Sequence, residues 1–229
     1  MNGGPTDRGG ASHAALMDRV YCRQRHIYDL TRKYYLLGRD RLVKELGAKP
    51  GETIVEIGCG TARNLIRIAQ AYPGTMLYGL DASAAMLRTA EEAVVRARLS
   101  DRIVLTHALA EDLTPGLFGL ERPFDHAIFS YSLSMIPDWR GALQRAAQSV
   151  GAEGIVHVVD FGDLKSLWPV ANKALRAWLR LFHVSPRDEL LGLLESGTQG
   201  GQDCTLRTWP GRYAFLLKAS RSAIEDLSR

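Results

Sequence analysis

Two glycines and a distant aspartate are the residues of this 229-residue chain whose types and spacing point most directly to chemistry. Gly58 and Gly60 follow the apolar run 53–57, and Asp81 ends the next apolar run. Glycines at such a place let the backbone turn tightly and approach a ligand, and a helix that begins there directs unpaired N–H groups at that ligand. An acidic residue ending the second strand is placed to accept hydrogen bonds from ribose hydroxyls. The pattern therefore predicts a nucleotide-type cofactor site.

The third small-residue position of this motif separates two kinds of cofactor. A dinucleotide fingerprint has Gly or Ala five residues after its first glycine, so that helix and strand pack closely around a pyrophosphate. This chain has Arg63 there, which disfavours a nicotinamide dehydrogenase. The stretch from Glu56 to Ala62 reads Glu-x-Gly-x-Gly-x-Ala and resembles the first motif of the class I S-adenosylmethionine (SAM) methyltransferases. The resemblance implies SAM as the cofactor.

Length and composition limit the remaining classes of protein. The length suits one α/β domain with additions. Residues 1–12 are polar and rich in glycine, and we expect a disordered tail there. No apolar run approaches the roughly 18 to 20 residues that a membrane-spanning helix needs. The three cysteines, Cys22, Cys59 and Cys204, lack metal-ligand spacing, so we expect reduced thiols, no metal and a cytoplasmic location.

Excess positive charge is confined to the first fifty residues. They hold ten Lys and Arg against five Asp and Glu, whereas the rest of the chain holds nineteen against twenty. Tyrosines are interleaved with these basic residues between positions 19 and 44. This mixture suits contact with phosphates, anionic lipid headgroups or an acidic small molecule. We interpret residues 13–50 as an N-terminal helical lid.

From residue 53 onward, short apolar runs alternate with helical periodicity, which is typical of a parallel sheet covered by helices. The expected strands lie near 53–57, 75–80, 103–107, 126–130 and 155–160, and the expected helices span 61–72, 83–99 and 138–150. Two helical segments, 164–183 and 188–195, then predict an insertion over about 164–196, followed by an antiparallel hairpin of 204–208 and 213–218. The predicted fold class is α/β: a Rossmann-like, mostly parallel seven-stranded methyltransferase sheet with N-terminal helices, its SAM-binding domain covering 51–229.

Later segments resemble the successive motifs of class I methyltransferases over residues 50–165. In that family the loop after the third strand holds the adenine, and the end of the fourth strand faces the sulfonium and the acceptor. Leu109 departs from the Asp of many relatives, so the adenine contact is assigned to Glu111 or to the backbone of Ala110. The cofactor-binding residues predicted in this way are Tyr34, Arg39, Glu56, Gly58, Cys59, Gly60, Asn64, Asp81, Ala82, Ala110, Glu111, Ser130 and Tyr131.

Two further segments, 21–41 and 182–187, resemble a narrower group, the bacterial diacylglyceryl-homoserine N-methyltransferases of betaine lipid synthesis. The resemblance implies successive methylation of the homoserine amine to a trimethylated lipid. A soluble amine, a quinone precursor or a natural product is an alternative acceptor, and an RNA-binding methyltransferase is a further alternative. RNA-base enzymes often carry an Asn/Asp-Pro-Pro-aromatic turn after the fourth strand. Residues 130–133 read Ser-Tyr-Ser-Leu instead, so we expect no nucleic-acid partner.

The expected reaction places demands on the acceptor side of the site. Methyl transfer is an in-line displacement, so an amine must lose its ammonium proton and must be oriented with water excluded. The candidate catalytic residues are Tyr131, Asp160 and His183, with Asp163 and His157 as weaker candidates for the base. An aromatic wall would attract a methylammonium through cation–π interaction. The candidate substrate-binding residues are Tyr28, Tyr35, Trp178 and Arg187.

One stripe of the insertion leaves two interpretations open. It comprises Trp168, Ala171, Leu175, Trp178, Leu179 and Phe182, with basic residues on another face. Such a helix either lies on a membrane surface or covers the sheet. With a lipid acceptor we expect peripheral contact with the inner membrane face, and the oligomeric state stays open.

Overall fold

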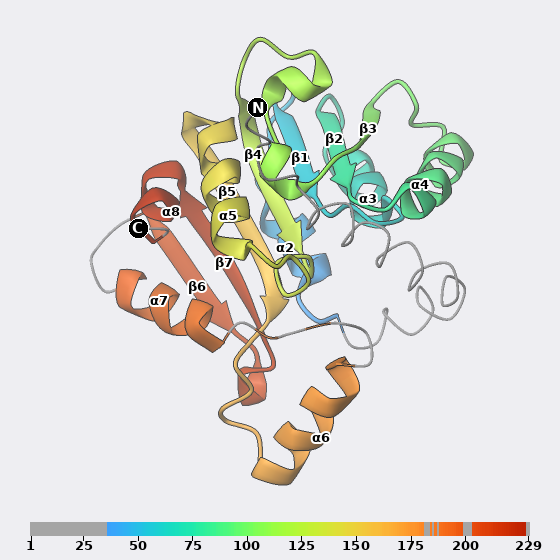
Figure 1. Cartoon of the computed structure of the whole chain (residues 1–229). Coiled ribbons are helices and arrows are strands. Elements are labelled where there is room, and N and C mark those ends of the chain that lie inside the picture. The colour runs from blue at the N-terminus through green and yellow to red at the C-terminus, as the bar shows by residue number, and fades with distance from the viewer. Residues whose placement is uncertain (1–35, 181–183, 185, 187, 199–202, 228–229) are drawn as a thin grey trace, which may run out of the picture.

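The computed structural model describes residues 36–180, 184, 186, 188–198 and 203–227. Seven strands in this part of the chain form one sheet in the order β3-β2-β1-β4-β5-β7-β6 (Figure 1). The strands are β1 (Thr53–Ile57), β2 (Met76–Asp81), β3 (Ile103–His107), β4 (Phe124–Ser130), β5 (Val150–Phe161), β6 (Cys204–Thr208) and β7 (Ala214–Ser220). β7 is antiparallel to both β5 and β6, whereas β1 to β5 pair in parallel. The predicted fold class is confirmed.

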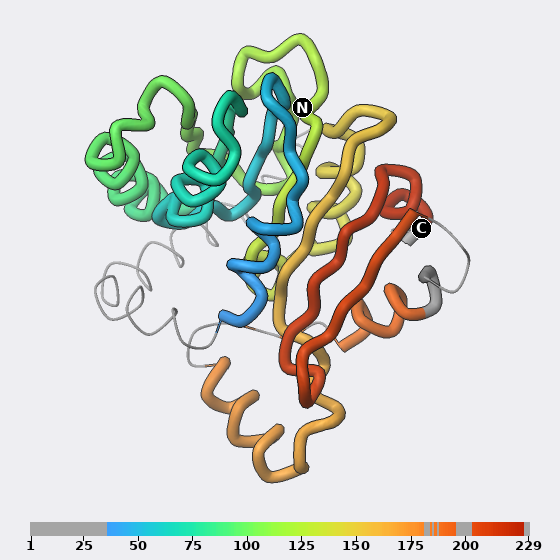
Figure 2. Tube along the Cα trace, turned by 180° about the vertical axis from the view of Figure 1, so that it is seen from behind, coloured from blue at the N-terminus to red at the C-terminus, as the bar shows by residue number. Residues whose placement is uncertain are grey.

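Helices cover both faces of the sheet (Figures 1 and 2). The helices are α2 (Arg39–Glu45), α3 (Arg63–Ala71), α4 (Ala84–Arg96), α5 (Trp139–Ser149), α6 (Pro169–Arg180), α7 (Asp188–Thr198) and α8 (Arg221–Leu227), and the 3-10 turns are η1 (Ala110–Asp112), η2 (Pro115–Phe118) and η3 (Pro210–Arg212). α2, α3 and α4 bury apolar residues in one core, and α5, α7 and α8 in another. No helix within the described ranges is long and apolar enough to cross a membrane.

Strand alternation divides the core between the two layers. Val156 and Val158 of β5 point into the layer of α5, α7 and α8, while Val159 and Phe161 point into the layer of α2, α3 and α4. Successive side chains of a strand face opposite sides, so a strand apolar on both sides must be covered on both. This requirement explains why β1, with every residue buried, lies between two helical layers.

Several boundaries of strands and helices differ from those predicted from the sequence. β5 begins at Val150, because the strand continues through the exposed residues 152–153 as it pairs with β4. α6 begins at Pro169 instead of 164: Leu164 has φ 59°, which is incompatible with a helix interior. α8 lies within the domain but was not predicted. Of the predicted lid, α2 is described, and residues 1–35 lie outside the described part.

Candidate cofactor and acceptor site

The glycine loop joins β1 to α3 at the carboxyl edge of the sheet. Gly58 has φ 72°, and a Cβ added there would lie 2.6 Å from Cβ of Ser132. Gly60 has φ 56°, and a Cβ added there would meet nothing within 4 Å. The N–H groups of Gly58 and Cys59 both donate to the carbonyl of Leu80, at 2.9 and 3.0 Å. The loop is therefore fixed at Gly58 and open at Gly60, where a ligand can approach the backbone.

Asp81 ends β2 opposite this loop, as the spacing predicted. One carboxylate oxygen accepts a hydrogen bond from N–H of Gly60 at 2.8 Å, and the other accepts one from N–H of Ser83 at 2.9 Å. Ser83 also caps α4 by accepting from N–H of Met86. A carboxylate has about four lone-pair positions, and the hydroxyl groups of a ribose are suitable donors to it.

Glu56 lies beneath the loop and is 2% exposed. Its Oε1 accepts from Nδ2 of Asn64 at 2.8 Å, and Oδ1 of Asn64 accepts from Nε of Arg39 at 3.2 Å. Its Oε2 is buried without a hydrogen-bond partner in the described part of the chain. Burial raises the pKa of Glu56 to about 7, while the bond from Asn64 and the charge of Arg39 oppose that rise. A ligand that donates a hydrogen bond would satisfy Oε2.

These groups fit SAM. A small cavity beside them is lined by Arg39, Glu56, Gly58, Cys59, Gly60, Thr61 and Arg63. The ribose suits Asp81, and a cationic amino group suits the unpartnered oxygen of Glu56. The thiol of Cys59 is buried, and burial raises its pKa, so it stays protonated in the loop.

The residues predicted to hold the adenine lie at the end of β3. Ala110 is buried at the start of η1, and Glu111 follows it. The carbonyl of Glu111 accepts from Nε of Arg145 on α5 at 3.0 Å, which holds the turn in place. On the neighbouring edge, the carbonyl of Ala82 lies 3.0 Å from Nε2 of His107. These contacts fix the turns on both sides of the predicted adenine position.

The acceptor side is built by the loop that follows β4. Oγ of Ser132 donates to the carbonyl of Ile57 at 2.7 Å, and N–H of Ser134 donates to Oδ2 of Asp160 at 3.0 Å. The loop therefore connects the end of β1 to the end of β5. The hydroxyls of Ser130 and Ser134 are buried without partners among the described residues.

Asp160 lies near the end of β5 and is 2% exposed, and its Oδ1 accepts from N–H of Phe161 at 2.7 Å. Three aromatic rings form a wall at the same end of the sheet. The rings of Tyr131 and Phe161 meet edge to face at 4.7 Å, and Phe161 meets Tyr213 at 5.8 Å. Burial, and next the charge of Asp160, raise the pKa of Tyr131 well above its usual value. Oη of Tyr131 donates to the carbonyl of Leu37 at 2.5 Å. Tyr131 is thus a protonated phenol. It links the aromatic wall, formed by Tyr131, Phe161 and Tyr213, to the residues before α2.

The weaker candidates for the base lie in other clusters. Both carboxylate oxygens of Asp163 accept from Arg212, at 2.7 and 2.9 Å, and that guanidinium also binds Glu195. These bonds keep the pKa of Asp163 low despite its burial. Nε2 of His157 lies 3.1 Å from Nδ1 of His126. Asp163 therefore anchors the insertion, and His157 belongs to a histidine pair.

The predicted stripe of the insertion has two environments. Leu175, Trp178 and Leu179 pack against the core on the α2 side, whereas Trp168 is 82% exposed. Three residues of the stripe thus cover the core. The candidates Tyr28, Tyr34, Tyr35, His183 and Arg187 lie outside the described residues, so their roles stay predictions.

The structure adds residues that sequence reasoning missed. Phe161 and Tyr213 reach the acceptor wall because β5 and β7 pair there, and N–H of Gly162 donates to the carbonyl of Tyr213. Ser134 reaches Asp160 through the loop after β4. No local motif marks these residues, because strand pairing brings them together across the sequence.

Fold and glycine loop together define an α/β domain that binds a nucleotide-type cofactor at the carboxyl edge of its sheet. Residues 55–156 match the family model described as a methyltransferase domain. The chain is 28% identical over 153 residues to the 2-phytyl-1,4-naphtoquinone methyltransferase of Trichormus variabilis, covering 64% of this chain and 63% of that protein. It is 29% identical over 195 residues to the ubiquinone/menaquinone biosynthesis C-methyltransferase UbiE of Syntrophotalea carbinolica, covering 83% and 76%.

Solved structures share the fold. A geranyl diphosphate methyltransferase in complex with GPP and sinefungin aligns with a TM-score of 0.61 at 15% identity, covering 80% of this chain and 76% of that one. Residues 55–156 therefore match a methyltransferase domain, which indicates an enzyme with SAM as its cofactor, and the chain spans slightly less than two thirds of the length of the first of these relatives.

Proposed function

We propose that this protein transfers methyl groups from SAM to the amine of diacylglyceryl-homoserine and forms the trimethylated betaine lipid. The observation that carries the proposal is the buried carboxylate of Asp160, whose charge acts on Tyr131, near an aromatic wall of Tyr131, Phe161 and Tyr213. A buried carboxylate favours a cationic partner, and aromatic faces attract methylammonium groups. The resemblance of segments 21–41 and 182–187 to the betaine lipid enzymes supports this acceptor.

The chemistry assigns distinct tasks to the residues. SAM supplies an electrophilic methyl group, whose bonding electrons stay with the departing sulfur when the amine lone pair forms the new N–C bond. In each round the amine must first lose a proton, and Asp160 accepts it in our proposal. Asp81 and Glu56 hold the cofactor, and Tyr131 with Phe161 orients the amine and excludes water.

The test uses purified protein, methyl-labelled SAM and diacylglyceryl-homoserine in detergent micelles. Mass spectrometry should find mono-, di- and trimethylated lipid. Asp160→Asn should slow every methyl addition, because the neutral amide accepts no proton. Glu153→Gln, on the exposed part of the same strand, is the matched control and should keep the wild-type rate. If the lipid stays unlabelled while the protein still binds SAM, this acceptor is wrong. If Asp160→Asn methylates the lipid at the wild-type rate, Asp160 is not the proton acceptor.

A quinone precursor is the second candidate acceptor, because the relatives compared above are named for naphthoquinone and ubiquinone/menaquinone methylation. The same aromatic wall would stack against a flat ring. An assay with 2-phytyl-1,4-naphthoquinol distinguishes the two, since carbon methylation gives a product without a quaternary amine. Both acceptors are lipidic in the cell, so either proposal includes peripheral contact with a membrane surface.

A further inference from the structure

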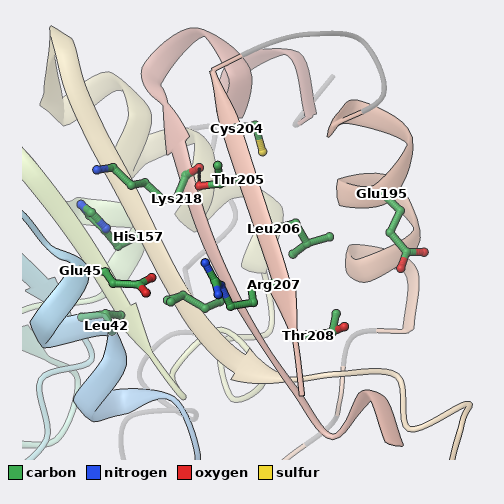
Figure 3. Close-up of a pocket in the computed structure, with 11 residues that line it drawn as sticks. Leu42, Glu45, His157, Glu195, Cys204, Thr205, Leu206, Arg207, Thr208 and Lys218 are labelled. Carbon is green, nitrogen blue, oxygen red and sulfur yellow. Dashed lines mark hydrogen bonds between the residues drawn. The ribbon is translucent and has the colours of Figure 1, made fainter. Parts of the chain in front are cut away.

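The antiparallel end of the sheet has an open face. In Figure 2, no helix crosses in front of β7 and β6 on this side, and α2 lies beside β5. A cavity of about 640 Å³ lies around the edge strand β6. Figure 3 shows Leu42, Glu45, His157, Arg207 and Lys218 on the side of β6 that faces α2. We call this side of the cavity the α2 groove.

Strand register sets the polar groups of the α2 groove in two neighbouring rows. His157, Lys218 and Thr205 are direct partners across β5, β7 and β6. The next row on the same face holds Leu216 and Arg207. Diagonal neighbours on one face of an antiparallel pair lie about 7–8 Å apart, within reach of long side chains. Lys218 and Arg207 can therefore approach one small ligand from adjacent strands.

Neither of these cations has an acidic partner within ion-pair distance in the part of the chain that the structure describes. The two carboxylates that line the cavity are already paired: Glu45 binds Arg41 at 2.7 Å, and Glu195 binds Arg212 at 2.6 Å. The α2 groove thus carries two uncompensated positive charges. Such a pair in a concave site favours a doubly charged oxyanion.

A histidine relay borders the same groove. Nε2 of His126 lies 3.1 Å from Oε2 of Glu52, and Nδ1 of His126 lies 3.1 Å from Nε2 of His157. A carboxylate only accepts, so His126 donates through Nε2 and accepts through Nδ1, and His157 must donate through Nε2. This assignment leaves Nδ1 of the neutral His157 as an acceptor without a proton. Burial, followed by the charges of His126 and Lys218, keeps the pKa of His157 well below its usual value.

We propose that the α2 groove binds a small phosphate monoester between Lys218 and Arg207, and that binding adds a proton to Nδ1 of His157. The dianion would oppose the charge of Lys218 and accept a hydrogen bond from the new N–H. The proton comes from the buffer, so binding and proton uptake are coupled. The charged and titratable groups around the relay and the groove are Glu52, Asp125, His126, Lys218, Arg207 and Glu45, which come from five different parts of the fold. This inference is independent of the methyl acceptor.

Isothermal titration with inorganic phosphate and with glycerol 3-phosphate tests the proposal in two buffers of different ionisation enthalpy. We expect saturable binding of both probes with net proton uptake at neutral pH. Lys218→Met or Arg207→Gln should each weaken binding about tenfold, the loss of one charge-assisted hydrogen bond. Lys173→Met is the matched control on the exposed surface of α6 and should bind as wild type. SAM affinity should not change in any of these variants.

His157→Gln separates the two parts of the proposal, because it should keep phosphate binding and abolish proton uptake. Should that variant not fold, imidazole ¹⁵N shifts of the wild-type protein give the same information, with protonation of His157 expected when phosphate is added. Wild-type affinity in Lys218→Met, or binding without any proton uptake by the wild-type protein, would overturn the proposal.

Discussion

Glu56 gives the sharpest physical prediction, because burial raises its pKa from 4.5 to about 7. A carboxyl whose pKa is higher in the folded state than in the unfolded state binds more protons when folded between those two values. The free energy of unfolding must then fall as the pH rises through this window, by about 3 kcal/mol for a shift of this size. Glu56→Gln keeps the shape and the bond from Asn64 but carries no titrating group. The variant should therefore lose this part of the pH dependence.

Urea denaturation of both proteins at several pH values between 4.5 and 7.5 measures the effect. The stability of Glu56→Gln relative to wild type should increase steadily across that range. Glu153→Gln, whose side chain is exposed, should follow the wild-type curve at every pH. Parallel curves for Glu56→Gln and wild type would refute the argument, because they would show that Glu56 has the same pKa in both states.

Three further predictions test the loop, the cofactor contact and the insertion. Gly58→Ala should lower the free energy of unfolding by about 2 kcal/mol more than Gly60→Ala. Both positions have a left-handed backbone, but only the Cβ at position 58 would also clash with Ser132. Urea denaturation compares the two variants, and equal losses of stability would contradict the clash with Ser132. Asp81→Asn should weaken SAM binding about tenfold in a calorimetric titration, whereas an unchanged Kd would remove Asp81 from the site. Arg212→Leu should lower the free energy of unfolding by about 3 kcal/mol, because it removes the guanidinium that binds both oxygens of buried Asp163 and leaves only the longer pair with Lys165. Denaturation at neutral pH measures this, and a wild-type midpoint would show that the ion pair contributes nothing.

The sheet was predictable because its signal is local. Apolar runs followed by helical periodicity placed β1, β3 and β6 at their observed bounds and established the α/β class. Boundaries failed where tertiary pairing decides the conformation. The start of β5 continues through two exposed residues because β4 pairs with it, and the start of α6 is set by the left-handed backbone of Leu164.

The residues of the site were likewise predictable only where their signal is local. The glycine loop, Glu56 and Asp81 were recognisable because the motif is nearly contiguous and because parallel strands end at one edge. The acceptor wall was only partly predictable. Tyr131 follows β4 and Asp160 lies near the end of β5, but Phe161 and Tyr213 meet only through the antiparallel pairing of β5 with β7. The ion pair of Asp163 with Arg212 likewise spans forty-nine positions, so its structural role was not visible in the sequence.

Methyl transfer from SAM to a lipid amine near Asp160 is the activity that we propose for this protein. The most direct measurement is a single competition assay in which the wild-type protein receives labelled SAM, diacylglyceryl-homoserine and 2-phytyl-1,4-naphthoquinol together in micelles. We expect label in the homoserine lipid, up to the trimethylated product, with slower labelling by Asp160→Asn. Label confined to the quinol, or homoserine lipid left unmodified while SAM is bound, would contradict it.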